Sequence, residues 1–280
     1  MSAQTGEQTG GATKLTATLA AARAEGRAAL VGYLPAGFPT VDGGIAAVKA
    51  LLEGGCDAVE IGLPHSDPVL DGATIQTADD IALRAGVRTK DVLRTVREVA
   101  SAFPQAPVLV MTYWNPVDRY GVDRFAADLA EAGGAGVILP DLPVEEAGPW
   151  LAAAERLGLD TVFVVAPSSR DERLRLVTAA GTGFVYAAAV MGVTGTREQV
   201  GDLAEDLVKR TRAVTDLPVC VGIGVSNEKQ AAEVAGFADG VIVGSAFVKR
   251  ILESGDDLES GLAGIRETAA ALARGVRAGG

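Results

Sequence analysis

Short apolar segments rich in β-branched residues alternate along the chain with longer segments in which apolar residues recur at helical spacing. The short segments lack strict polar alternation, which is typical of parallel strands that are covered on both faces. The pattern predicts eight strands, at residues 30–34, 58–62, 108–112, 136–139, 161–165, 183–187, 219–222 and 240–243. It predicts helices at 41–53, 73–84, 89–102, 123–132, 145–157, 171–179, 197–213, 227–235, 246–252 and 258–277.

Eight strand–helix units in a chain of 280 residues match the repeat number and size of a (β/α)8 barrel, or TIM barrel. The alternative is an open doubly wound sheet, but no Gly-x-Gly-x-x-Gly motif follows the first strand. We therefore expect an α/β fold with a single barrel domain over residues 14–276, preceded by a disordered tail at 1–13. In such barrels the chemistry lies on loops after the C-terminal ends of the strands.

The composition argues against several functional classes. The 25 basic and 36 acidic residues give a net charge of −11, which disfavours binding to nucleic acids or anionic membranes. The N-terminal segment has neither the basic nor the apolar region of a secretory signal. Cys56 and Cys220 both lie in apolar runs, which indicates a reducing compartment, and we expect the cytoplasm. His65 is the one histidine in the sequence, so we expect no metal site.

A single acidic residue, Glu60, lies inside the second predicted strand. Period-two alternation places it on one face with Ala58 and Gly62, and these small residues leave room for a ligand at the barrel mouth. Burial of an unpaired carboxyl raises its pKa, which suits a group that gives and takes protons near neutral pH. The alternative is a structural carboxylate held by an interior cation, but no predicted strand contains Lys or Arg. Glu60 is therefore the first candidate catalytic residue.

The loop after this strand is acidic and is stiffened by two prolines, and it carries Pro64, His65, Ser66, Asp67, Pro68 and Asp71. On spacing alone, Asp71 is a turn residue before a glycine, which is a common role for aspartate. His65 is interpreted as an ordinary loop residue.

Glycines follow three consecutive strands near the C-terminal end of the chain, within residues 192–195, 222–224 and 244–245. Glycine lets backbone amides approach a ligand, and a helix N-terminus adds free N–H groups and a positive dipole. Ser245, at the start of a helix, is a candidate N-cap residue and phosphate ligand. Loops after the seventh and eighth strands commonly hold phosphate in this fold. The pattern predicts a small phosphorylated substrate.

The lysines all lie outside the predicted strands, which disfavours an aldolase that forms a Schiff base on a strand lysine. A zinc-type aldolase is disfavoured because it needs several histidines. The mechanism that remains is acid–base catalysis by carboxyl groups, acting on a substrate that is a phosphate ester.

Six segments then carry a specific resemblance, among them Val-Glu-Ile-Gly-Leu-Pro-His-Ser-Asp-Pro at 59–68, Tyr-Trp-Asn-Pro at 113–116 and Met-Gly-Val-Thr-Gly at 191–195. The others are 71–76, 140–146 and 244–246. In order and sequence they resemble the tryptophan synthase alpha subunit, from about Lys14 to about Arg274. The resemblance implies retro-aldol cleavage of indole-3-glycerol phosphate to indole and glyceraldehyde 3-phosphate, in tryptophan biosynthesis.

The resemblance also assigns residues. Glu60 matches the glutamate that protonates the indole ring carbon, and Asp71 matches the aspartate that binds the indole N–H, which replaces its interpretation as a turn residue. The implied substrate pocket consists of Tyr33, Met111, Ile138, Tyr186 and Thr194, although Met111 and Ile138 are equally compatible with ordinary barrel core. Thr194 would close onto Asp71 within a lid at 190–197. The implied phosphate ligands are Gly195, Gly224, Gly244 and Ser245.

The family also implies a partner. Its alpha subunits dock on a pyridoxal-phosphate-dependent beta subunit in an α2β2 complex, so this chain itself would need no cofactor. The matching contact residues are Pro64, Asp67, Asn115, Pro116 and Pro143, which the sequence places on proline-stiffened exposed loops. The chain departs from the family pattern at His65, at the apolar segment 188–190 and at Pro140.

Three alternatives stay open at the level of sequence. The first is a free-standing lyase that releases indole, and the second is a non-catalytic subunit that only activates a beta chain. The third is another phosphate-binding barrel, such as a sugar-phosphate isomerase. Retention of both Glu60 and Asp71 disfavours the second. The scarcity of polar groups in the predicted pocket favours an aromatic substrate over the third.

Overall fold

The computed structural model describes residues 12–68, 71–189 and 197–279. Within them, eight parallel strands form a closed barrel in chain order, and β8 pairs with β1. The strands are β1 (Ala29–Pro35), β2 (Ala58–Gly62), β3 (Val108–Met111), β4 (Gly136–Leu139), β5 (Asp160–Val165), β6 (Val185–Ala188), β7 (Val219–Gly222) and β8 (Gly240–Val243). The predicted barrel is thus confirmed.

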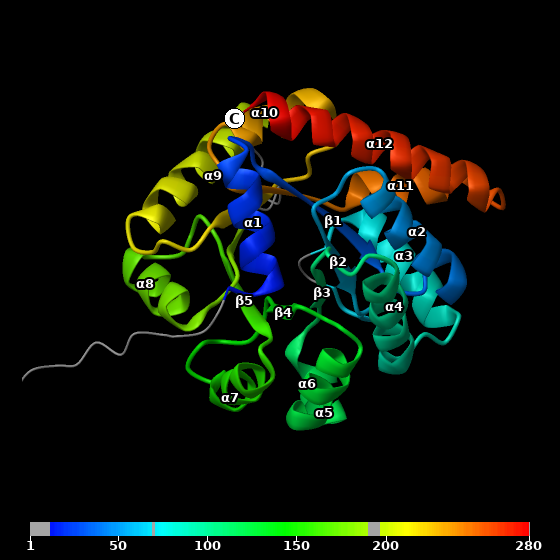
Figure 1. Ribbon diagram of the computed structural model, residues 1–280, viewed down its shortest axis with the longest axis horizontal. Coiled ribbons are helices and arrows are strands. Elements are labelled where there is room, and N and C mark those ends of the chain that lie inside the picture. Colours follow the sequence, from blue (N-terminus) through cyan, green and yellow to red (C-terminus); the bar gives the residue numbers. More distant parts are fainter. Residues whose placement is uncertain (1–11, 69–70, 190–196, 280) are drawn as a thin grey trace, which may run out of the picture.

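Helices surround the strands (Figure 1). They are α1 (Lys14–Ala24), α2 (Val41–Glu53), α3 (Ala73–Arg84), α4 (Thr89–Ala102), α5 (Trp114–Tyr120), α6 (Val122–Glu131), α7 (Gly148–Leu157), α8 (Asp171–Ala180), α9 (Arg197–Arg212), α10 (Glu228–Ala235), α11 (Ser245–Ser254) and α12 (Leu258–Ala278). None of the helices in the described ranges is both long enough and apolar enough to cross a membrane.

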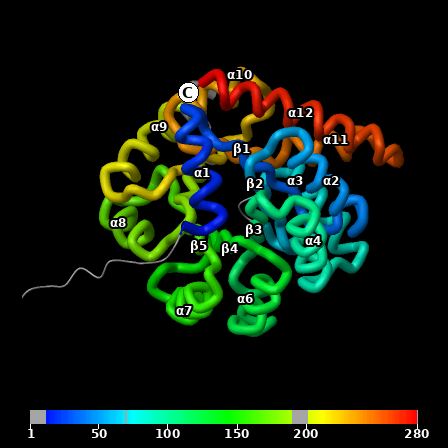
Figure 2. Tube along the Cα trace, viewed as in Figure 1, coloured from blue at the N-terminus to red at the C-terminus, as the bar shows by residue number. Residues whose placement is uncertain are grey.

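The core has two layers, as expected for strands that are covered on both faces. Val59 and Ile61 of β2 belong to the outer layer, between the sheet and the helices, whereas Ala58 belongs to the cluster inside the barrel. Leu15 and Leu19 of α1 pack into the inner cluster, and α1 crosses in front of the strands in Figures 1 and 2. The strand parity predicted around Glu60 is therefore confirmed, and α1 fills one end of the barrel.

A few element boundaries differ from the sequence prediction. β6 begins at Val185 and not at residue 183, because Gly183 has a φ of 73° and belongs to a turn. α7 begins at Gly148 and not at 145, since Pro149 is tolerated only in the first helical turn. α1 and α5 were not predicted, and α5 occupies part of the segment that was expected to be a contact loop.

Candidate active site

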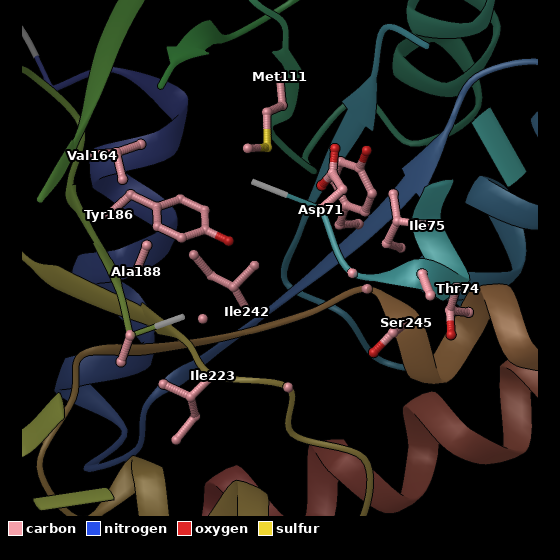
Figure 3. Close-up of a pocket in the computed structure, with 17 residues that line it drawn as sticks. Asp71, Thr74, Ile75, Met111, Val164, Tyr186, Ala188, Ile223, Ile242 and Ser245 are labelled. Carbon is pink, nitrogen blue, oxygen red and sulfur yellow. The ribbon is translucent and has the colours of Figure 1, made fainter. Parts of the chain in front are cut away.

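A cavity of about 350 Å³ opens at the C-terminal ends of the strands. Its lining includes Met111 of β3, Val164 of β5, Tyr186 of β6 and Ile242 of β8. Figure 3 shows Tyr186 and Asp71 on opposite sides of this cavity, with Ile242 between them in this view. An apolar chamber with a few polar groups at its edge suits a ligand that has a flat apolar part.

Two glycines at strand ends make space for two tyrosines that line the cavity. A Cβ atom on Gly62 of β2 would overlap the hydroxyl of Tyr33, and a Cβ atom on Gly222 of β7 would overlap that of Tyr186. Each tyrosine ring therefore lies across the end of a neighbouring strand. Burial raises the pKa of both hydroxyls well above the ordinary value, so both stay neutral.

Glu60 lies opposite Tyr33 in the β1–β2 register and is fully buried. Neither carboxyl oxygen has a hydrogen-bond partner, and no cation in the described part of the chain pairs with it. Burial raises its pKa to about 8, so the group holds a proton at neutral pH. It is not among the residues that line the cavity, whereas its register partner Tyr33 is.

Asp71 lies at the cavity edge and is half-buried. Its backbone is held by a hydrogen bond from its N–H to the Pro68 carbonyl (3.0 Å) and by one that its own carbonyl accepts from the Gln76 amide (2.8 Å). Burial raises the pKa of the carboxyl to about 6, partly offset by His65. At neutral pH the site therefore combines a protonated Glu60 with an ionised Asp71, which is the division of roles that acid–base catalysis needs.

Gly224, Gly244 and Ser245 lie together in the cavity lining. Gly224 has a φ of 76°, where a residue with a side chain would be strained. Gly244 is the N-cap of α11 and Ser245 is its first residue, so the expectation that Ser245 is the N-cap is wrong. The ring of Tyr33 occupies the space that a side chain at Gly244 would need. Glycine backbone and a helix N-terminus together suit an anionic group.

Comparison with known families gives a match over nearly the whole chain. The sequence model of one family, described as tryptophan synthase alpha chain, matches residues 19–277. This chain belongs to the tryptophan synthase alpha chain family. The recognition made from the sequence motifs is thereby confirmed.

Similar alpha chains come from several bacteria. The tryptophan synthase alpha chain of Streptomyces avermitilis is 71% identical over 265 residues, covering 95% of each chain. That of Streptomyces coelicolor is 72% identical over 263 residues, covering 94% of this chain and 96% of the other. A crystal structure of tryptophan synthase from M. tuberculosis, in the aminoacrylate-bound form, superposes with a TM-score of 0.86 at 49% identity, covering 95% of this chain and 100% of that one.

The residues predicted to bind substrate do not all line the cavity. Tyr33, Met111 and Tyr186 line the cavity. Ile138 is fully buried in the cluster inside the barrel and is not among the lining residues. Thr194 and Gly195 lie outside the described residues, as do all residues of the predicted lid at 190–197 except Arg197.

The predicted partner-contact residues are mixed in exposure and in structure. Asp67, Asn115 and Pro143 are exposed, and Pro116 is half-buried. Pro64 is buried, so the expectation of an exposed loop is wrong at that position, where the chain continues directly from β2. Asn115 and Pro116 belong to α5 and not to a loop.

Sequence reasoning missed several residues around the site of this alpha chain. Ile223 and Ile242 line the cavity, but an aliphatic residue at the end of a strand looks the same in the sequence whether it binds substrate or packs in the core. Asp79 is buried on α3 and was not singled out. A signal was present, because Asp79 falls among Ile75, Ala78 and Ala82 on the buried face of an amphipathic helix.

Proposed function

We propose that this chain cleaves indole-3-glycerol phosphate to indole and glyceraldehyde 3-phosphate by acid–base catalysis of Glu60 and Asp71. The observation that carries the assignment of residues is a pair of carboxyl groups that both act on the cavity-lining Tyr33 and Tyr186 and that have separated pKa values, about 8 for Glu60 and about 6 for Asp71. One group is a proton donor and the other an anion over the same pH range.

The proton transfers follow from these two states. Glu60 donates its proton to the indole ring carbon that bears the glycerol chain, and the ring nitrogen gains positive charge. Asp71 accepts a hydrogen bond from the indole N–H and stabilises that charge. The Glu60 carboxylate then takes the proton of the adjacent hydroxyl. A carbonyl forms, the carbon–carbon bond breaks, and its electron pair returns to the ring, which releases indole and the aldehyde.

The cavity accommodates the two ends of this substrate separately. Met111, Val164 and Ile242 provide apolar surface for the indole. Gly224, Gly244 and Ser245 are at the end suited to the phosphate, where the N-terminus of α11 points. We infer that Gly195 adds a further backbone contact and that Thr194 closes a lid over Asp71, which would exclude water during the reaction.

The partner in this proposal is a tryptophan synthase beta chain, in an α2β2 complex in the cytoplasm. Pro64, Asp67, Asn115, Pro116 and Pro143 would lie at or near the contact. Pyridoxal phosphate is held on a lysine, and no lysine is among the described residues that line this cavity. The site does not fit that cofactor, so we assign it to the beta chain and none to this one.

The direct test is incubation of the purified chain with indole-3-glycerol phosphate, with indole and glyceraldehyde 3-phosphate measured separately. Equal amounts of both products are expected. Absence of both products, with and without a beta chain, would contradict the lyase assignment. A rate that is unchanged by a beta chain would favour the free-standing lyase, and activity of the beta chain that rises while no cleavage occurs would favour the activating subunit.

A further inference from the structure

Within the described residues, buried side-chain oxygens without a hydrogen-bond partner occur on two residues, Glu60 and Asp79. Glu60 belongs to the proposed chemistry, whereas Asp79 has no part in it. Asp79 is 3% exposed, and its Oδ1 is the unpartnered atom. A buried polar atom without a partner opposes folding, so the residue calls for a role other than stability.

Asp79 lies next to the part of α3 that lines the cavity. It is on α3, the helix that begins two residues after Asp71, and α3 packs against β1 and α11. Ile75, one helical turn earlier on the same face, lines the cavity. The carboxyl of Asp79 therefore has a fixed position on the inward face of a packed helix, next to the loop that carries the catalytic aspartate.

The groups that face Asp79 come from both ends of that loop. The charge of Asp71, at the end of the loop, raises the pKa of Asp79, and the backbone N–H of His65, near its start, lowers it. Burial is the largest influence, and the resulting pKa of Asp79 is about 7. The charges of Asp71, Asp79 and Glu60 all raise the pKa of Tyr33 on β1, although burial has the larger effect.

No described cation neutralises this carboxyl. The charged residues of α11, Lys249 and Arg250, pair with Glu253. On α3 itself, Arg84 pairs with the exposed Asp80. An acid that is buried without a cation is stable mainly in its protonated form.

We propose that Asp79 is a positioning residue for the lyase reaction: through the backbone of His65, its buried carboxyl ties the loop between β2 and α3 to the inward face of α3, and this fixes the position of the Asp71 carboxyl. The inference rests on the proposed function. It assigns Asp79 no contact with substrate. When Asp79 loses its proton, a second negative charge stands beside Asp71, and repulsion displaces the catalytic carboxyl from the indole N–H.

Two substitutions separate positioning from a purely structural role. Asp79→Asn keeps the shape and the polar contacts but cannot ionise, whereas Asp79→Leu keeps the number and branching of the side-chain heavy atoms and removes the polar group. Asp80→Asn is the matched control, because it removes an acid from the next position of the same helix on the exposed face. Steady-state indole release would be measured from pH 5.5 to 9 for all four proteins, together with glycerol phosphate affinity and melting temperature.

At pH 6.5 we expect Asp79→Leu to lower kcat by about tenfold or more, while glycerol phosphate affinity stays within about twofold and the melting temperature does not fall. Asp79→Asn should keep kcat within about threefold. In the wild type, kcat should decline as pH rises through about 7, the pKa of Asp79. In Asp79→Asn the decline should move to about 8, where Glu60 loses its proton.

The role of Asp79 would be overturned if the kcat of Asp79→Leu equalled that of the wild type. It would also be overturned if kcat of Asp79→Asn declined at the same alkaline pH as in the wild type. If Asp79→Leu does not fold, the pH profile of Asp79→Asn decides alone. An active wild type whose Asp79 variants all behave like Asp80→Asn refutes only the positioning role. A wild type that releases no indole refutes the proposed function itself, and the positioning role with it.

Discussion

The imidazole of His65 lies against the ring of Tyr113, with the ring centroids 4.5 Å apart and the planes tilted by 46°. The Nδ1 atom of His65 accepts the backbone N–H of Asp67 at 3.1 Å. On the other side, the N–H of Trp114 donates to Oδ1 of Asp141 at 2.8 Å. The three segments proposed to contact the partner, after β2, β3 and β4, are thus connected to one another at the barrel mouth.

This connection leads to a prediction about coupling. Because the loop after β2 carries Asp71 at one end and Asp67 at its exposed part, a beta chain that binds there can favour one arrangement of Asp71, the proposed catalytic aspartate. We expect an added beta chain to raise the lyase rate by at least about tenfold, which corresponds to ~1.4 kcal/mol of barrier. Lyase kinetics across a titration with beta chain measure this effect.

Thr194 provides the matched variant for that experiment. Thr194→Val keeps the shape of the side chain but deletes the hydroxyl that is proposed to reach Asp71, so the stimulation should be smaller. Equal stimulation of the two proteins would show that the coupling does not pass through this contact.

Removal of the proton on Glu60 should stop the chemistry and spare binding. Glu60→Gln keeps size and polarity, and we expect turnover to fall by about 10²–10⁴-fold with little change in glycerol phosphate affinity. Steady-state kinetics and calorimetry on the same preparation measure the two quantities. Near-normal turnover in the variant would mean that Glu60 is structural.

Glu60 also makes a prediction about stability. Its pKa is raised in the folded state, from 4.5 to about 8, so the folded protein binds a proton that the unfolded chain has released. The protonated Glu60 therefore stabilises the fold fully below pH 4.5, and this stabilisation is lost as pH rises through about 8. Urea midpoints should decline more steeply between pH 5 and 8.5 in the wild type than in Glu60→Gln. Parallel declines would show that Glu60 is ionised in the folded state.

The phosphate end can be tested with a charge. Ser245→Asp places a carboxylate at the first residue of α11, where a negative charge is compatible with the helix dipole, so the fold should survive. Glycerol phosphate binding should become undetectable because of charge repulsion. Ser260→Asp, which puts the same charge in the first turn of α12 at an exposed position, is the control. Calorimetry that finds the same affinity in both variants would remove Ser245 from the phosphate site.

The strands were predictable because each carries a continuous apolar run, and Glu60 was predictable because an acid interrupts one of them. The role proposed for Asp71 was not predictable from spacing, since an aspartate before glycine looks the same whether it forms a turn or binds substrate. Met111 and Ile138 are register partners on β3 and β4, yet Met111 lines the cavity and Ile138 does not. Depth along the barrel depends on strand tilt and stagger, which the sequence pattern does not contain.

The position of helix α1 determines the route by which substrate enters and product leaves. Its Leu15 and Leu19 fill the barrel from the N-terminal side, and Thr13 just before it donates a hydrogen bond to Asp160 at the start of β5 (2.6 Å). The cavity is therefore closed at the N-terminal side of the barrel, and substrate and product share the opening at the C-terminal ends of the strands. A subunit that covered this opening would control both the entry of substrate and the release of product, and the departing indole would pass to it directly instead of entering solvent.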